Sequence, residues 1–533
     1  MDSAVKTFMA VFILTLFLVE SGMAGTYTEG VFTYSYSDGI KDSGVLTQCS
    51  QSTGTVLVPT TFTPTFSQTI YKVRTIGDGR TAPFYTTPTL NIALQDTVTK
   101  LASYSLAYLK QSNFSIPATV TVIDSYAFYG CPNLLTINIP SGVTSLGSYA
   151  FRGCIKLSNI TIPSTVSSIG DGAFYQTDIT SITIPSSVRT FGKSVFSTCT
   201  KLTSCVLPNT INAIPEGTFY GCGSMSTFGF PSSITSIGNQ AFAGCSFSTL
   251  QIPSTVTSIG DYAFNQCKNL LSITIPTSVV FIGTGAFAGC VNLNNVVIPN
   301  TLTSIGDSWF AGDTSLDNIT IPTSVTSIGN SAFGGCNALL NFTLPNGITS
   351  IGNSAFSYCI NLASINIPAS VTTIQDAAFY GCRSLQYIKI PPSVSSLGNS
   401  TFVDCPALAR VYFFGAPPLS DYPFDTNQAA KTTGGNLPLV FYTPNSVGWV
   451  NSFGGRPTTV IQPSSASPAF TESGVFKIDF DTLPGFTYGV QSSSDLMTWN
   501  YVQSNIQGDG MTKTYTESNI AGDKMFYRVV LQY

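Results

Sequence analysis

Apolar residues recur along most of this chain with a period far longer than that of a helix or a strand. In residues 252–274, IPSTVTSIGDYAFNQCKNLLSIT, apolar side chains stand three, six and eleven places after the proline, at Val256, Ile259 and Phe264. The residue eleven places after the proline is phenylalanine in all thirteen units of this kind. We expect these rings to stack into one buried aromatic column.

The units begin with Ile-Pro or a close variant, and successive prolines are 23 residues apart, with 22 twice. A fixed period of this size is typical of a solenoid, in which each unit forms one coil that stacks on the preceding coil. An isolated coil cannot bury enough apolar surface to fold, so we expect each coil to depend on its neighbours. The prolines are Pro117, Pro140, Pro163, Pro185, Pro208, Pro231, Pro253, Pro276, Pro299, Pro322, Pro345, Pro368 and Pro391.

The end of each unit alternates apolar and polar residues, as in LLSITIP, where Ile273 and Ile275 are the apolar positions. This alternation predicts one short parallel strand per coil, ended by the proline that follows. Gly260 precedes an aspartate, as its counterparts precede Asp, Asn or Ser in most units, and this pair predicts a tight turn before the phenylalanine.

The repeated pattern resembles that of BspA-type leucine-rich repeats, IPxxVTSIGxxAFxxCxxLxSIxIP, over residues 116–412. It continues more weakly upstream, where VRTIGDG (73–79) echoes part of a unit. The resemblance implies a right-handed solenoid, and family members are mostly surface or secreted proteins of bacteria and mucosal protozoa, several of them adhesive. The stretch FFGAPPLSDYPF after Tyr412 is similar to the terminal unit of bacterial members and favours a bacterial source.

The predicted fold is a leucine-rich-repeat solenoid of 22–23-residue coils with a parallel β-sheet face, followed by a small C-terminal β-sandwich. We expect a signal peptide (1–24), a β-rich N-terminal cap (25–92), the solenoid (93–412), its C-terminal cap (413–461), a Pro/Ser linker (462–468) and the β-sandwich (469–533).

Composition excludes several classes of function. Charged residues make up 9% of the chain and the net charge is −4, so nothing in the sequence predicts an electrostatic nucleic-acid site. The chain has no histidine, which rules out Ser-His-Asp and Cys-His catalysis within it. We therefore expect no enzyme activity, no cofactor and no metal site.

The first residues predict export from the cell. Lys6 precedes an apolar run from Phe8 to Val19, and Gly22 and Ala24 have the small-residue spacing that a signal peptidase accepts. This run of twelve residues is too short to span a bilayer, which needs about 20. We expect a secreted or cell-surface protein with no transmembrane segment after removal of the signal.

Eleven of the thirteen cysteines stand fourteen places after the proline. We interpret them as a column of small buried side chains, because equivalent residues of stacked coils point side by side and not toward each other, as a disulfide requires. Thr177 and Asp313 replace cysteine in two units, which also argues against a metal cluster. Cys49 and Cys205 lie off the column, and whether they pair is left open.

If Ile273 and Ile275 point inward, the residues between them and their equivalents define an exposed, polar, nearly uncharged face. We expect this face to bind a protein or glycan surface through many weak contacts. The alternative is a structural spacer that displays the C-terminal module, and Asn-x-Thr sequons at Asn159, Asn318 and Asn341 would let glycans cover the face in a eukaryotic host. The candidate binding residues are Thr136, Asn138, Asn159, Thr161, Ser272, Thr274, Asn295, Asn318, Thr320, Asn341, Thr343, Ser364 and Asn366.

Overall fold

The computed structural model describes most of the chain from Ala24 onward. The described residues are 24–29, 32–37, 44–49, 53–59, 61–62, 71–77, 83, 89–424, 438–443, 446–461, 467–470, 476–482, 486–494, 496–509, 511–517 and 526–532. Residues 1–23 of the predicted signal peptide lie outside them. Among the described residues, none forms a helix with the length and hydropathy needed to cross a bilayer.

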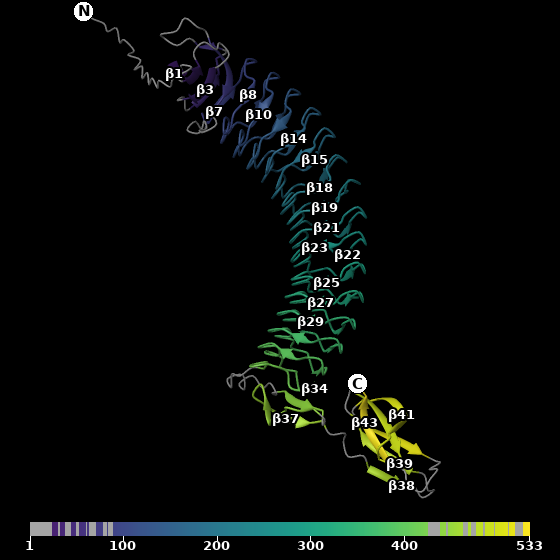
Figure 1. The fold of residues 1–533 in the computed structure, drawn as a ribbon. Helices are drawn as coiled ribbons and strands as arrows, with labels where there is room; N and C mark the ends of the chain where they lie inside the picture. The colour runs from purple at the N-terminus through teal and green to yellow at the C-terminus, as the bar shows by residue number, and fades with distance from the viewer. Residues whose placement is uncertain are drawn as a thin grey trace, which may run out of the picture.

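The fold is a β-solenoid whose coils stack into a curved rod (Figure 1). Most coils contribute two strands, one more than the sequence pattern predicted. The additional strand lies five and six places after the proline, at Ser258–Ile259 in the unit that begins at Pro253. The pattern there was interpreted as isolated apolar positions, because a two-residue strand is too short to show alternation.

The short strands pair in parallel and form what we call the short-strand ladder, whose described part comprises three sheets. Its strands are β8 (Lys100–Leu101), β10 (Val122–Ile123), β12 (Ser145–Leu146), β14 (Ser168–Ile169), β16 (Thr190–Phe191), β18 (Ala213–Ile214), β19 (Ser236–Ile237), β21 (Ser258–Ile259), β23 (Phe281–Ile282), β25 (Ser304–Ile305), β27 (Ser327–Ile328), β29 (Ser350–Ile351), β31 (Thr373–Ile374) and β33 (Ser396–Leu397).

The predicted strands form a second set of parallel sheets, the long-strand ladder. Its strands are β9 (Asn113–Ser115), β11 (Thr136–Asn138), β13 (Asn159–Thr161), β15 (Ser181–Thr183), β17 (Ser204–Val206), β20 (Thr249–Gln251), β22 (Ser272–Thr274), β24 (Asn295–Val297), β26 (Asn318–Ile319), β28 (Asn341–Thr343), β30 (Ser364–Asn366), β32 (Tyr387–Ile390), β34 (Arg410–Phe413), β35 (Leu439–Tyr442) and β37 (Arg456–Val460), with β36 (Ser452–Phe453) antiparallel to β37.

Strands before the first repeat extend the short-strand ladder, and β4 and β7 pair in a separate parallel sheet. β6 pairs in parallel with β8, and β3 pairs with β6, so the weak echo at 73–79 lies in line with the short strands. β1, β2 and β3 follow as an antiparallel end to that sheet. The strands are β1 (Ala24–Glu29), β2 (Phe32–Ser37), β3 (Gly44–Cys49), β4 (Thr53–Leu57), β5 (Thr61–Phe62), β6 (Tyr71–Ile76) and β7 (Thr89–Ala93).

The predicted aromatic column is confirmed. From Phe128 to Phe402, each phenylalanine stacks on the next with ring centroids 5.2–6.0 Å apart and planes within 21°. Phe424 continues the column beyond the repeats, 5.7 Å from Phe402. The rings are buried and lie between the two ladders, so they form the centre of one continuous hydrophobic core.

Two residues in each of the thirteen coils adopt the left-handed conformation, on either side of the phenylalanine. They stand nine and thirteen places after the proline, as Tyr262 (φ 55°) and Gln266 (φ 57°) do around Phe264. The predicted turn before the phenylalanine is present at residues 261–266, but Gly260 itself is not left-handed. Its place is explained by crowding, because a Cβ atom there would lie 2.4 Å from Oδ1 of Asn239 in the preceding coil.

The cysteine column consists of free, buried thiols, as expected. Each thiol also donates a hydrogen bond to a carbonyl of the preceding coil, which the sequence did not reveal; Cys154 Sγ donates to Phe128 O at 3.1 Å. Cys205 lies in β17 as a free, buried thiol, so it does not pair with Cys49.

These thiols should be unreactive while the protein is folded. Burial raises the pKa of Cys199 to about 11 and those of Cys267 and Cys359 to about 12, so almost no thiolate exists at pH 8. We expect the twelve described cysteines to stay unlabelled by an alkylating reagent at pH 8 and to react fully in denaturant, as measured by peptide mass spectrometry. Rapid native labelling of any one of them would show that its coil is open.

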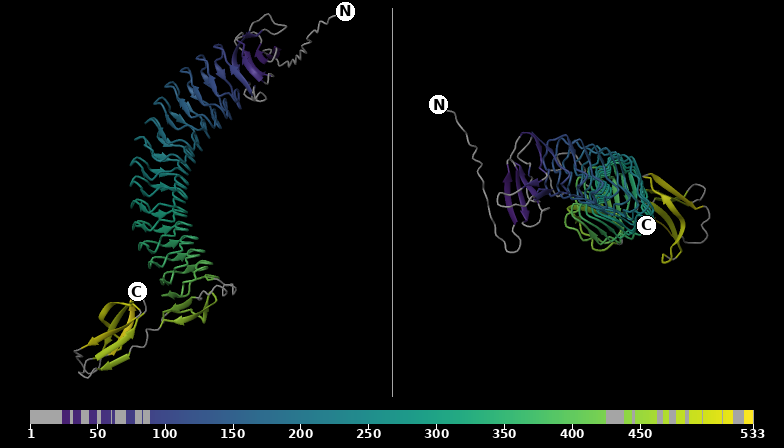
Figure 2. Two further views of the ribbon diagram at one scale, coloured as in Figure 1. Left: turned by 180° about the vertical axis from the view of Figure 1, so that it is seen from behind. Right: turned by 90° about the horizontal axis from the view of Figure 1, so that it is seen from above.

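The C-terminal module consists of two antiparallel three-stranded sheets. Its strands are β38 (Ser467–Phe470), β39 (Phe476–Asp481), β40 (Thr487–Ser493), β41 (Asn500–Gln507), β42 (Thr512–Glu517) and β43 (Phe526–Gln532), so the first strand begins inside the predicted linker. The module lies beside the last coils (Figure 2). Phe486 contacts the solenoid there, with its ring 4.6 Å from that of Tyr412 and 4.4 Å from Nζ of Lys389.

Candidate functional site

The outward side chains of the long-strand ladder follow the predicted alternation. In β11, Thr136 and Asn138 are exposed while Ile137 between them is buried. The candidate residues Asn159, Thr161, Thr274, Asn295, Thr320, Asn341, Thr343 and Asn366 are also exposed, Ser272 and Ser364 are half-buried, and Asn318 lies in β26.

Parallel pairing places these residues in three hydrogen-bonded patches, of which the second and third lie on successive coils. They lie on β11 and β13, on β22, β24 and β26, and on β28 and β30, which belong to three different sheets. Within the third patch, Ser364 Oγ donates a hydrogen bond to Asn341 Oδ1 at 2.6 Å. The face is therefore polar, as predicted, but its backbone ladder is interrupted.

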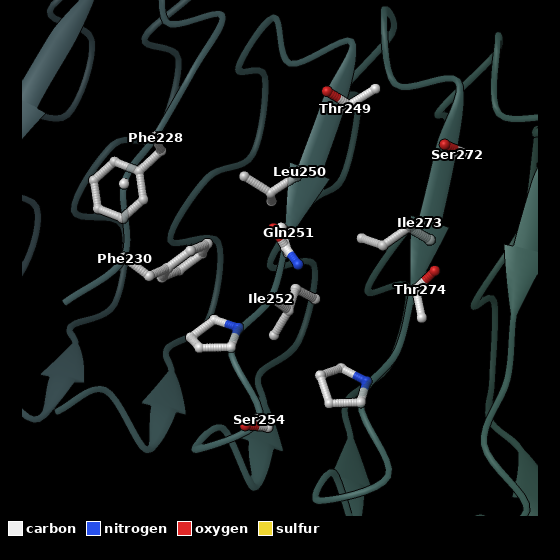
Figure 3. Close-up of a pocket in the computed structure, with 13 residues that line it drawn as sticks. Phe228, Phe230, Thr249, Leu250, Gln251, Ile252, Ser254, Ser272, Ile273 and Thr274 are labelled. Atoms are coloured by element: carbon white, nitrogen blue, oxygen red, sulfur yellow. The ribbon is translucent and has the colours of Figure 1, made fainter. Parts of the chain in front are cut away.

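The largest interruption is the coil between β17 and β20, where residues 226–230 form no strand. Of the described strands, β17 pairs only with β15 and β20 pairs only with β22, so each has an unpaired edge toward this coil. Figure 3 shows the consequence, with Phe228 and Phe230 on a segment without an arrow beside Thr249, Leu250 and Gln251 of β20.

Two phenylalanines explain why the strand is missing. Phe228 and Phe230 stand where the other coils place inward aliphatic residues such as Ile273 and Ile275. A single phenylalanine fits at the first of these positions, because Phe342 is buried within β28. Two rings together, 4.9 Å apart, exceed the available space and stay half-buried.

The interrupted coil borders a groove of about 990 Å³, which we call the Phe228 groove. Its lining combines the two phenylalanine rings with the hydroxyl and amide side chains of Thr249, Gln251 and Ser254. All the lining residues are uncharged. An edge strand beside half-buried aromatic rings provides backbone hydrogen-bonding groups and an apolar contact for a neutral, extended ligand.

Sequence reasoning missed this groove, although a signal was present. The unit reads TFGFP where others read SITIP, so Gly229 and two aromatic residues replace the usual alternation. A second hollow of about 520 Å³ lies at the start of the long-strand ladder, and two predicted residues, Thr136 and Asn138, line it. No group of His, Cys, Asp and Glu in the described residues is arranged to hold a metal ion.

The repeats match a known family. The model of the BspA type leucine rich repeat region matches residues 80–203, 191–317 and 303–429, which together span about two thirds of the chain. This chain belongs to the BspA-type leucine-rich repeat family. The left-handed turns, the phenylalanine column and the thiol column are thus features of a BspA-type solenoid, and the Phe228 groove is a departure from its repeat.

Several solved structures of proteins are similar to this chain. A leucine-rich repeat protein of Bacteroides ovatus is similar to this BspA-type chain at 25% identity and a TM-score of 0.51, over 74% of this chain and 95% of that protein. A leucine rich cell surface protein of Faecalibacterium prausnitzii matches at 23% identity, TM-score 0.36, over 74% and 95%. The pneumococcal vaccine antigen PcpA matches at 16% identity, TM-score 0.34, over 82% and 98%. No curated protein matches the chain.

Proposed function

We propose that this protein is a non-enzymatic, secreted or cell-surface recognition protein that binds a protein or glycan surface through the long-strand ladder. The observation that carries the proposal is the row of exposed Thr and Asn side chains on that ladder, together with the uncharged Phe228 groove within it. Short hydroxyl and amide groups repeated along stacked strands suit many weak contacts. The predicted leader and the family membership support an extracellular location.

Three lysines on the long-strand ladder should weaken binding. We expect the full-length triple variant T274K/N295K/N341K to lose at least about tenfold in retention on arrays of immobilised matrix proteins and glycans, because each lysine places a hydrated charge in a neutral contact. The control variant S145K/T190K/S304K adds the same charge at exposed positions of the short-strand ladder. It should bind like the wild type.

Two results would contradict the proposal. One is an unmodified protein that is not retained above background, and the other is equal loss in both triple variants, which would indicate a general effect of charge. Binding that survives both variants but is lost when Phe486→Ala loosens the C-terminal module would favour the alternative, a spacer that displays this module.

A further inference from the structure

The turns of the first coils carry a cluster of tyrosines around one arginine, on a part of the coil separate from the long-strand ladder. Tyr104, Tyr126 and Tyr149 come from three successive coils and stack with ring centroids 4.6 and 5.1 Å apart. The guanidinium carbon of Arg152 lies 5.6, 5.4 and 4.8 Å from the ring centres of Tyr129, Tyr149 and Tyr175. We call these six half-buried residues the tyrosine ridge.

Most coils form without a tyrosine at the position that Tyr104, Tyr126 and Tyr149 occupy. Tyr126 and Tyr149 stand nine places after the proline of their units, and Tyr104 stands nine places after Gln95, which takes the place of proline in the unit upstream. Their φ angles are 60°, 57° and 59°, a conformation that costs energy for a tyrosine. Later coils carry glycine, serine, glutamine or alanine at this left-handed position, as at Gly172 and Ser194, and Tyr262 is a single tyrosine between Gln240 and Gly285. The ridge ends at Gly172, where a Cβ atom would lie 2.3 Å from the ring of Tyr149. Three successive tyrosines in a strained conformation indicate a role other than folding.

The exposed groups of the ridge are hydrogen-bond donors and a positive charge. None of the ion pairs in the described part of the chain involves Arg152. No described hydrogen bond engages the hydroxyls of Tyr104, Tyr126 or Tyr149. Residues 95–205 contain seven Lys or Arg and four Asp or Glu, although the whole chain carries a net charge of −4. Three of these cations are already ion-paired, Lys100 with Asp124, Lys201 with Asp178 and Lys193 with Glu216 just beyond the range, whereas Arg152 is in no ion pair of the described residues.

The geometry points to an extended uronic-acid polysaccharide as the ligand of the tyrosine ridge. A guanidinium held between aromatic rings keeps its N–H edges in a fixed plane that suits a carboxylate. The stacked rings place phenol hydroxyls at intervals set by the coil spacing, which is similar to the length of one pyranose residue in an extended chain. A polymer with one carboxylate per sugar lying along the coils would thus meet Arg152 and a row of tyrosine hydroxyls.

The test measures binding of a galacturonate hexamer to the full-length protein by calorimetry, with the fully methyl-esterified hexamer as the matched neutral ligand. We expect binding of the acid form only, weakening as salt rises. Arg152→Gln should lose at least about tenfold in affinity, as expected when a charge-assisted pair is removed. Tyr149→Ser, which introduces the residue found at this position in other coils, should also weaken binding. Arg189→Gln removes the same charge from an exposed residue two coils further along and should bind normally.

Absence of binding to the acid hexamer, or equal loss in Arg152→Gln and Arg189→Gln, would overturn the proposal. Binding of an acidic peptide in place of the sugar polymer would also overturn it. The triple variant T274K/N295K/N341K should retain hexamer binding, so the ridge and the long-strand ladder can succeed or fail independently.

Discussion

Phe264→Ala should lower the free energy of unfolding of the central coils by about 3–5 kcal/mol. The ring is fully buried and stacks at 5.6 Å on both Phe242 and Phe287, so its removal leaves a cavity in the middle of the column. Each coil contacts mainly its neighbours, so the loss of stability should be confined to the coils around residue 264. Hydrogen exchange followed by mass spectrometry should show accelerated exchange there, and urea unfolding should show a lower midpoint.

Phe281→Ala is the matched control for this prediction. It is the same substitution in an adjacent coil, but the side chain is 57% exposed. We expect a change within about 0.5 kcal/mol. Similar losses for both variants would mean that the stacked column is not what holds the coils together.

Asp313→Cys should stabilise the protein, by roughly 1–3 kcal/mol at pH 7. Asp313 occupies the cysteine column and is fully buried. Its Oδ1 accepts a hydrogen bond from Cys290 N at 2.8 Å, whereas its Oδ2 has no hydrogen-bond partner. A cysteine would restore the small thiol of the other coils, and Cys290 N keeps Phe287 O as an acceptor.

The gain in stability from Asp313→Cys should increase as the pH rises. Burial raises the pKa of Asp313 well above its usual value, so the folded protein retains a proton that the unfolded chain releases above about pH 4. The wild type therefore loses stability as pH rises from about 4, and the advantage of Asp313→Cys should grow over the same range. Urea unfolding under reducing conditions between pH 4 and pH 8 measures this difference.

Thr177→Cys provides the control, because Thr177 fills the other non-cysteine position of the column. Its hydroxyl donates to Phe174 O at 3.0 Å and carries no ionisable group. Its effect should be small and independent of pH. A pH-independent gain for Asp313→Cys would contradict a neutral buried carboxyl.

The sequence by itself determined the solenoid, its period and its core. A period of 22–23 residues leaves one way to bury Phe264 and its twelve equivalents, which is to stack the coils so that the rings coincide. The alternation around Ile273 likewise predicted which side chains of the long strands face solvent, because residues of a strand point to opposite sides in turn. Such features repeat in every unit and depend on local periodicity.

Only the tertiary structure revealed the contacts between residues of adjacent coils. The second strand of each coil has two residues, and only its partners in neighbouring coils reveal it. The contact of Gly260 with Asn239, the thiol–carbonyl bonds and the stacking of Tyr126 on Tyr149 all join residues of adjacent coils. The Phe228 groove exists because two rings in one coil exceed a space set by its neighbours. The residues that differ from the repeat therefore form the Phe228 groove and the tyrosine ridge, because the repeated residues pack against the neighbouring coils.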